Sequence, residues 1–142
     1  MIYRPRYHVV IDTNVVFEGL TKTGSAAGLV VEAWQHGLIC PHVSNALAYE
    51  YADVLSRKLS PAKWGRIQPV LQFMLTQARF VKIYYTWRPS SPDPGDDLVI
   101  DCALNAGVPV VTSNLRDFRS AHYALGLKIM SPLAFVALLA DM

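Results

Sequence analysis

The sequence predicts an α/β fold built on a central, mostly parallel sheet of four to five strands. Short apolar runs rich in β-branched residues alternate with longer segments whose apolar residues recur at helical spacing. The chain is also 52% hydrophobic and 17% charged, as suits a sheet covered by helices on both faces. We therefore expect one domain over residues 1–142, long enough to bury a hydrophobic core.

The first predicted strand, Tyr7–Ile11, is an apolar run that ends abruptly in the polar residues Asp12, Thr13 and Asn14. These polar residues favour turns, so a plain turn is the alternative to a site at this position. The remaining predicted strands are Leu38–Pro41, Phe80–Tyr85, Val108–Thr112 and, at an edge of the sheet, Leu127–Met130.

Helix starts are predicted where a serine or aspartate precedes apolar residues at helical spacing. Ser25, Ser44 and Ser60 each fit an N-cap, and Pro61 fits the first position of a helix. The predicted helices are Ala26–His36, Asn45–Lys58, Ala62–Ala78 with a bend near Pro69, Pro94–Ala106, Arg116–Ala124 and Pro132–Leu139. The predicted loops are Thr21–Gly24 and the proline-rich Arg88–Gly95.

Several functional classes are disfavoured by composition. The net charge of +2 is too small to indicate nucleic-acid binding by itself, and no apolar run reaches membrane-spanning length. We expect a cytoplasmic protein without a membrane partner. Cys40 and Cys102 fit small buried hydrophobes. The histidines fall in no ligand spacing, and they are His8, His36, His42 and His122.

The 11 acidic residues are unevenly distributed along the chain. Asp12 follows the first strand, Asp96 and Asp97 lie in the first turn of a helix, and Asp117 follows the fourth strand. Since the carboxyl ends of parallel strands meet at one edge of a sheet, these acids are expected to gather there. Glu50 lies within a predicted helix, and its position alone does not imply that edge.

The acids at the start of the predicted helix Pro94–Ala106 also have a purely structural explanation. Asp93 fits an N-cap, and acids in a first helical turn are favoured by the helix dipole. On a helical wheel, however, Asp96 continues an apolar line and should face the sheet, whereas Asp97 and Asp101 share the adjacent strip.

Carboxylates that converge on one cleft repel each other. Such a site either keeps a proton at a raised pKa or binds a hard divalent cation that prefers oxygen ligands. No cysteine–histidine cluster accompanies the acids in the sequence, so Mg²⁺ or Mn²⁺ is expected rather than zinc.

Three blocks in this order resemble the PIN-domain family (PilT N-terminus-like), and within it the VapC-like toxin ribonucleases of bacterial toxin–antitoxin pairs. The first block is Val9–Val15, reading VVIDTNV. The second is Val43-Ser44 followed by Glu50. The third runs from Asp93-Pro94-Gly95-Asp96-Asp97 through Ala106-Gly107 to Val111-Thr112-Ser113-Asn114, with Asp117-Phe118.

This resemblance implies a three-layer α/β/α PIN-like fold and metal-dependent endoribonuclease activity. Asp12, Glu50 and Asp96 match the acidic triad of the family, with Asp97 the alternative third acid. Asp97 or Asp101 would hold a water bound to Mg²⁺ or Mn²⁺. The remaining metal and supporting candidates are Asp117, Thr13, Asn14, Thr112, Ser113 and Asn114.

One departure from the family pattern concerns the number of metal ions. Many members carry an acid where this chain has Asn114, so a one-metal and a two-metal site both stay open, with Asp117 a partial substitute. The implied partners are RNA, an antitoxin protein and a second copy of the chain in a homodimer. Candidate contacts to the RNA backbone are Lys22, Arg88, Arg116 and Arg119.

Two other functions compete with a ribonuclease. A haloacid-dehalogenase-like phosphatase would also place an aspartate after a buried strand, but it needs a second aspartate where Asn14 stands. A PIN-like fold could also be kept as a catalytically silent binding module. The intact positions Asp12, Glu50 and Asp96 favour the enzyme.

Overall fold

The computed structural model describes residues 6–87, 91 and 93–141. Its sheet has five strands, and every neighbouring pair is parallel. The strands are β1 (Tyr7–Ile11), β2 (Ile39–Val43), β3 (Arg79–Phe80), β4 (Val110–Val111) and β5 (Ile129–Met130), in the spatial order β3-β2-β1-β4-β5. The central strand β1 is therefore flanked by β2 and β4, and the predicted parallel α/β sheet is confirmed.

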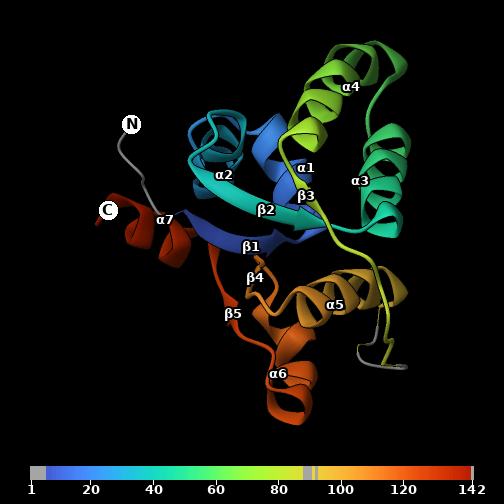
Figure 1. Ribbon diagram of the computed structural model, residues 1–142. Coiled ribbons are helices and arrows are strands. Elements are labelled where there is room, and N and C mark those ends of the chain that lie inside the picture. The colour runs from blue at the N-terminus through green and yellow to red at the C-terminus, as the bar shows by residue number, and fades with distance from the viewer. Residues whose placement is uncertain (1–5, 88–90, 92, 142) are drawn as a thin grey trace.

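Helices lie on both faces of this sheet, as the three-layer prediction requires. They are α1 (Thr13–Thr21), α2 (Ala26–Gln35), α3 (Asn45–Lys58), α4 (Pro61–Thr76), α5 (Pro94–Ala106), the 3₁₀ turn η1 (Leu115–Phe118), α6 (Arg119–Leu125) and α7 (Pro132–Ala140). Helices α1 and α2 cover one face, and α5 covers the other (Figure 1). Every crossover between these parallel strands thus passes through helical segments.

The predicted helix starts are confirmed by their capping hydrogen bonds. The hydroxyls of Ser25, Ser44 and Ser60 accept from backbone N–H groups three residues ahead, at 3.0, 3.1 and 3.2 Å. The Asp93 carboxylate accepts from the N–H of Gly95 at 2.9 Å. Each cap satisfies one of the donors that a helix start leaves unpaired.

Helix α1 was absent from the sequence prediction. Its start carries β-branched residues of modest helix propensity, and the preceding Asp12 makes no side-chain capping bond. The helix forms because Val15 and Val16, both fully buried, pack into the core. Tertiary burial here outweighs weak local signals.

The predicted strand Phe80–Tyr85 was too long. Only Arg79–Phe80 forms β3 on β2. Farther along, the backbone N–H groups of Tyr84 and Tyr85 donate to Asn105 Oδ1 at 3.0 and 3.2 Å, and Asn105 Nδ2 donates to the Tyr85 carbonyl at 2.8 Å. A side chain of α5 therefore replaces the strand partner that this segment lacks.

The core lies between the sheet and its covering helices. The central strands contribute fully buried valines and Ile11, and α2 contributes the fully buried Trp34. The indole Nε1 of Trp34 donates to the carbonyl of Met74 at 2.8 Å, which joins α2 to α4. Both cysteines are free and buried, as predicted. Within the described part of the chain, none of the helices combines the length and apolar character of a membrane span.

Candidate functional site: an acidic cluster at the carboxyl edge of the sheet

The centre of the candidate site is Asp12, directly after β1 and only 1% exposed. The Thr112 hydroxyl, just past β4, donates to Asp12 Oδ2 at 2.7 Å and accepts from the backbone N–H of Asn114 at 3.0 Å. The backbone N–H of Asp12 also donates to the Val111 carbonyl at 2.9 Å. The adjacent ends of β1 and β4 thereby fix the position of this carboxylate.

Opposing effects act on the charge of Asp12. Burial raises the pKa of Asp12, whereas the hydrogen bond from Thr112 and the backbone N–H groups of Thr13 and Asn14 lower it. The net direction is upward, and the negative charge of Asp93 adds to the rise. The hydroxyl of Thr13 is buried and has no hydrogen-bond partner among the described residues.

Helix α5 begins at the same edge and brings further acids. Asp96 and Asp97 are 7% and 5% exposed. Burial, and to a smaller extent the charges of Asp12, Asp93, Asp117 and Asp97, together raise the pKa of Asp96 to about 7. Carboxylates separated by more than 80 positions in the sequence therefore share one electrostatic site.

Glu50, half-buried on α3, lies beside the start of α5. A Cβ atom added to Gly95, in the first turn of α5, would lie 3.0 Å from Glu50 Oε1 and 3.4 Å from Asp93 Oδ1. The absence of a side chain at Gly95 thus makes room for both carboxylates. The spacing of the acids in the sequence did not predict that Glu50 lies near this edge. The resemblance to the PIN-domain family did.

The segment after β4 contributes an amide and another acid. Asn114 Nδ2 donates to Asp117 Oδ2 at 2.6 Å, and Asp117 is half-buried. Asn114 therefore holds Asp117 beside the cluster, while Ser113 is exposed. Asp117, three residues beyond Asn114, stays the predicted partial substitute for the acid that many family members carry at position 114.

Asp101 differs from the other candidate acids. It is 3% exposed and lies one turn farther along α5 than Asp97. Its charge contributes to raising the pKa of the Cys102 thiol. Asp101 stays a predicted holder of a metal-bound water on the next turn of α5.

The predicted basic contacts are only partly near the cluster. Arg116 and Arg119 are exposed and flank Asp117 in the chain. Lys22 is exposed at the far end of α1, about 15 Å along the helix axis from Asp12, so its predicted place at the site edge was wrong. Arg88 lies outside the described residues.

The cluster fits a hydrated divalent cation. Among the described residues, no three carboxylates place an oxygen each within 4.8 Å of one another. Mg²⁺ suits such spacing because it usually keeps several waters and takes one or two carboxylates directly. The buried, mutually repelling acids are the feature of this chain that matches such an ion.

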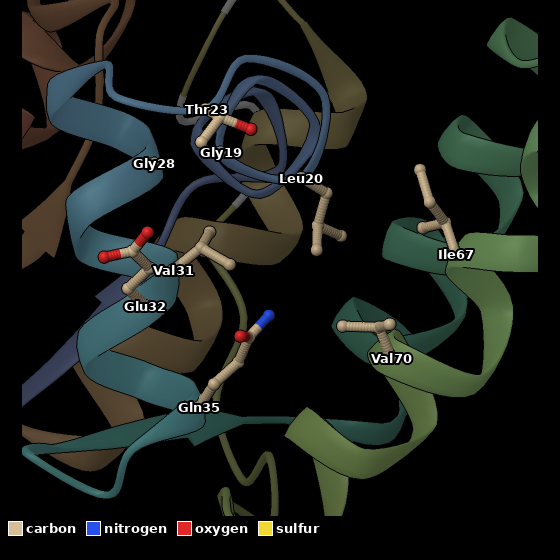
Figure 2. Close-up of a pocket in the computed structure, with 9 residues that line it drawn as sticks. All are labelled: Gly19, Leu20, Thr23, Gly28, Val31, Glu32, Gln35, Ile67 and Val70. Atoms are coloured by element: carbon tan, nitrogen blue, oxygen red, sulfur yellow. The ribbon is translucent and has the colours of Figure 1, made fainter.

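A separate pocket lies between α1, α2 and α4, with a volume of about 250 Å³. Figure 2 shows Leu20 and Val31 facing Ile67 and Val70 of α4, with Gln35 beside them. The lining contains none of the acids of the cluster. Its lining is mixed, because Leu20, Ile67 and Val70 share it with polar side chains that include Glu32 and Gln35.

A sequence model of the PIN domain matches residues 8–116. The chain belongs to the PIN-domain family. PIN domains are typically nucleases and generally use a divalent metal. The matched span includes Asp12, Glu50, Asp96 and Asn114. Family membership argues against the haloacid-dehalogenase-like alternative.

Solved structures share this fold at low sequence identity. The structure of FitAB bound to an IR36 DNA fragment has a TM-score of 0.59 and 18% identity, covering 87% of this chain and 94% of the other. VapBC2 from Rickettsia felis, bound to a DNA fragment from its promoter, has a TM-score of 0.64 and 14% identity, covering 87% and 98%. No curated protein sequence gives a significant match.

Proposed function

We propose that this PIN domain is a Mg²⁺- or Mn²⁺-dependent endoribonuclease and the toxin of a toxin–antitoxin pair. The observation that carries the proposal is that a PIN domain buries Asp12, Asp96 and Asp97 at one edge of its sheet, where they are 1%, 7% and 5% exposed. Gathering buried carboxylates against their own repulsion costs stability unless a cation or a proton offsets their charge. Such a cost is typical of functional sites.

Asp12, Glu50 and Asp96 would hold the ion, directly or through water, with Asp97 or Asp117 completing the site. A bound divalent ion supplies Lewis-acid polarisation of water and of the phosphodiester. Thr112 orients Asp12 through its 2.7 Å hydrogen bond. The half-buried Asp117, held by Asn114, is the remaining acid for a second ion, and the number of ions stays open.

Basic residues of this chain would also bind the negatively charged phosphates of the substrate. Arg116 and Arg119 are exposed next to the cluster in sequence and can contact phosphates of the RNA backbone. Without such contacts and a bound cation, the acidic cluster would repel a phosphodiester. RNA as the substrate is proposed from the resemblance to VapC-like ribonucleases.

Cleavage of a structured RNA in Mg²⁺, in Mn²⁺ and in chelator tests the enzyme. We expect Asp12→Asn to lower the metal-dependent rate by at least ~100-fold. This exceeds the usual loss when a residue that only hydrogen-bonds to a metal ligand is replaced. Asp53→Asn, in an exposed ion pair with Arg57 on α3, is the matched control and should leave the rate unchanged. Equal cleavage by Asp12→Asn and the parent protein would favour a silent binding module instead.

The antitoxin partner is proposed from the neighbouring folds, which are toxin–antitoxin complexes bound to DNA. We place an apolar side chain of the antitoxin against Leu20, Ile67 and Val70, the apolar part of the pocket between α1, α2 and α4. Ile67→Glu should then weaken the complex formed on co-expression with the neighbouring antitoxin reading frame, while RNA cleavage persists. An unchanged complex would remove the pocket from the interface. A cytoplasmic location and a homodimer also stay predictions.

A further inference from the structure

A second group of potential metal ligands lies on β1 and β2, away from the acids. His8 of β1 is in register with Cys40 of β2, and His42 follows Cys40 by two residues on the same strand. Alternate residues of a strand share a face, so all three side chains project from one face of the sheet. One ligand atom from each lies within 4.8 Å of the others.

The sequence prediction that the histidines lie in no ligand spacing was wrong for this pair. His8 and His42 are 34 positions apart, yet His8 Nδ1 and His42 Nε2 lie 2.9 Å from each other. The available signal was the Cys-x-His pattern within a strand, which puts both side chains on one face. The partner from the adjacent parallel strand depends on the register, and the sequence does not specify that register.

We propose that His8, Cys40 and His42 form a transition-metal site that binds Zn²⁺ and is separate from the acidic cluster. A thiolate and two imidazoles are a zinc donor set, with a fourth position left for water. Tetrahedral bonds of about 2.0–2.3 Å place neighbouring donors roughly 3.3–3.6 Å apart. The observed atoms need only small side-chain shifts to reach these distances.

The burial of the three side chains suits a bound ion that solvent can still reach. Cys40 and His42 are each 7% exposed, whereas His8 is exposed and provides the route of entry. Among the described residues, no fourth histidine, cysteine or acid joins the group. The positive charge of Arg79, next to His42 on β3, lowers the affinity for a cation and predicts a site weaker than a closed structural zinc site.

Binding has a definite proton balance. The hydrogen bond between the two imidazoles requires one of the facing nitrogens to carry a proton, and that ring must move it to its other nitrogen when both bind metal. The Cys40 thiol gives its proton to solvent as the metal–sulfur bond forms. About one proton is therefore released for each ion bound.

This site and the acidic cluster lie at different ends of the same strand. His8 precedes Asp12 by four residues, which is about 13 Å along a strand. Nitrogen and sulfur donors favour Zn²⁺, whereas the carboxylates favour Mg²⁺ or Mn²⁺. A zinc ion bound to β1 and β2 would hold together the two strands from which Asp12 and α3 extend.

The test is metal titration of the purified protein, with Zn²⁺ followed by thermal unfolding and Co²⁺ followed by absorption. At zinc concentrations 100 times the dissociation constant, we expect the unfolding temperature to rise by roughly 8–10 °C. Co²⁺ should give a thiolate charge-transfer band, and excess Mg²⁺ should abolish neither signal. Weakly buffered titration should release about one proton per zinc ion.

Variants locate the ion. Cys40→Ser and His8→Ala should both lose the temperature shift and the cobalt band, and the exposed position of His8 makes the second variant safe for folding. Cys102→Ser, at the other buried cysteine, should keep both signals. The proposal is overturned if the parent protein shows neither signal, if Cys40→Ser or His8→Ala keeps them, or if Cys102→Ser loses them. Loss in Asp96→Asn would place the ion in the acidic cluster instead.

Discussion

Replacing Asp96 by asparagine tests whether the acidic cluster is strained by its own charge. In the folded protein, Asp96 keeps its proton up to about pH 7, whereas the unfolded chain ionises near pH 3.8. The folded state therefore binds more protons between these values, and the free energy of unfolding must fall as pH rises through this window. Stability from this group is present below about pH 4 and is lost above about pH 7.

The structure sets the size of the effect. A pKa of about 7 in place of 3.8 corresponds to at most roughly 4 kcal/mol, and solvent screens part of it because protein surrounds Asp96 only in part. Asparagine has nearly the same shape and cannot ionise. We therefore expect Asp96→Asn to be more stable than the parent protein by about 2–4 kcal/mol at pH 8 in chelator, and by much less at pH 4.5.

Urea unfolding at both pH values, in chelator and in Mg²⁺, measures this difference. Burial and the charges of His8 and Arg79 lower the pKa of His42, so His42 contributes stability that is lost as pH falls. This contribution has the opposite sign to that of Asp96 and is the same in both proteins. Mg²⁺ at pH 8 should stabilise the parent protein more than Asp96→Asn. The same pH dependence in both proteins, or a less stable Asp96→Asn at pH 8, would refute the reasoning. Asp53→Asn should follow the parent protein.

Further substitutions test the packing of α1 on α2 and the contacts that position Asp12 and the end of β1. Gly19→Ala should cost about 2–4 kcal/mol in urea unfolding, because the new Cβ would lie 2.5 Å from the Ala27 carbonyl oxygen where α1 crosses α2. Thr112→Val removes the hydrogen bond to Asp12 and should lower metal-dependent cleavage by roughly 10–100-fold with the fold retained by circular dichroism. Tyr51→Phe leaves the buried carbonyl at the end of β1 without its 2.5 Å donor and should cost about 1–3 kcal/mol by the same unfolding assay.

The sequence predicted the positions of Asp12 and Asp96 well, because strand ends and first helical turns are local features. A parallel sheet then brings the carboxyl ends of its strands to one edge whatever the details of packing. A raised pKa was also expected from the repulsion between converging acids, although burial is its larger cause at Asp96. These inferences needed only the order of the elements and their direction.

Other features depended on contacts between distant residues. The place of Glu50 depends on the space left at Gly95, and the pairing of Asn114 with Asp117 depends on the turn after β4. Helix α1 depends on burial of its valines, and its direction carries Lys22 away from the acids. Neither hydrophobic period nor composition contains this information.

The two ends of β1 can sort cations by the chemistry of their donors. At the carboxyl end, oxygen ligands are spread wider than direct ligation by three carboxylates allows, which favours an ion that keeps its water. Toward the amino end, two imidazoles and a thiol lie close together in a mostly buried cluster, which favours an ion that exchanges water for nitrogen and sulfur. Because β1 connects the two, zinc binding near His8 should stabilise the strand that positions Asp12 without competing for the acids. Zinc should therefore raise the unfolding temperature in the presence of saturating Mg²⁺, and additive shifts from the two ions would distinguish two sites from one shared site.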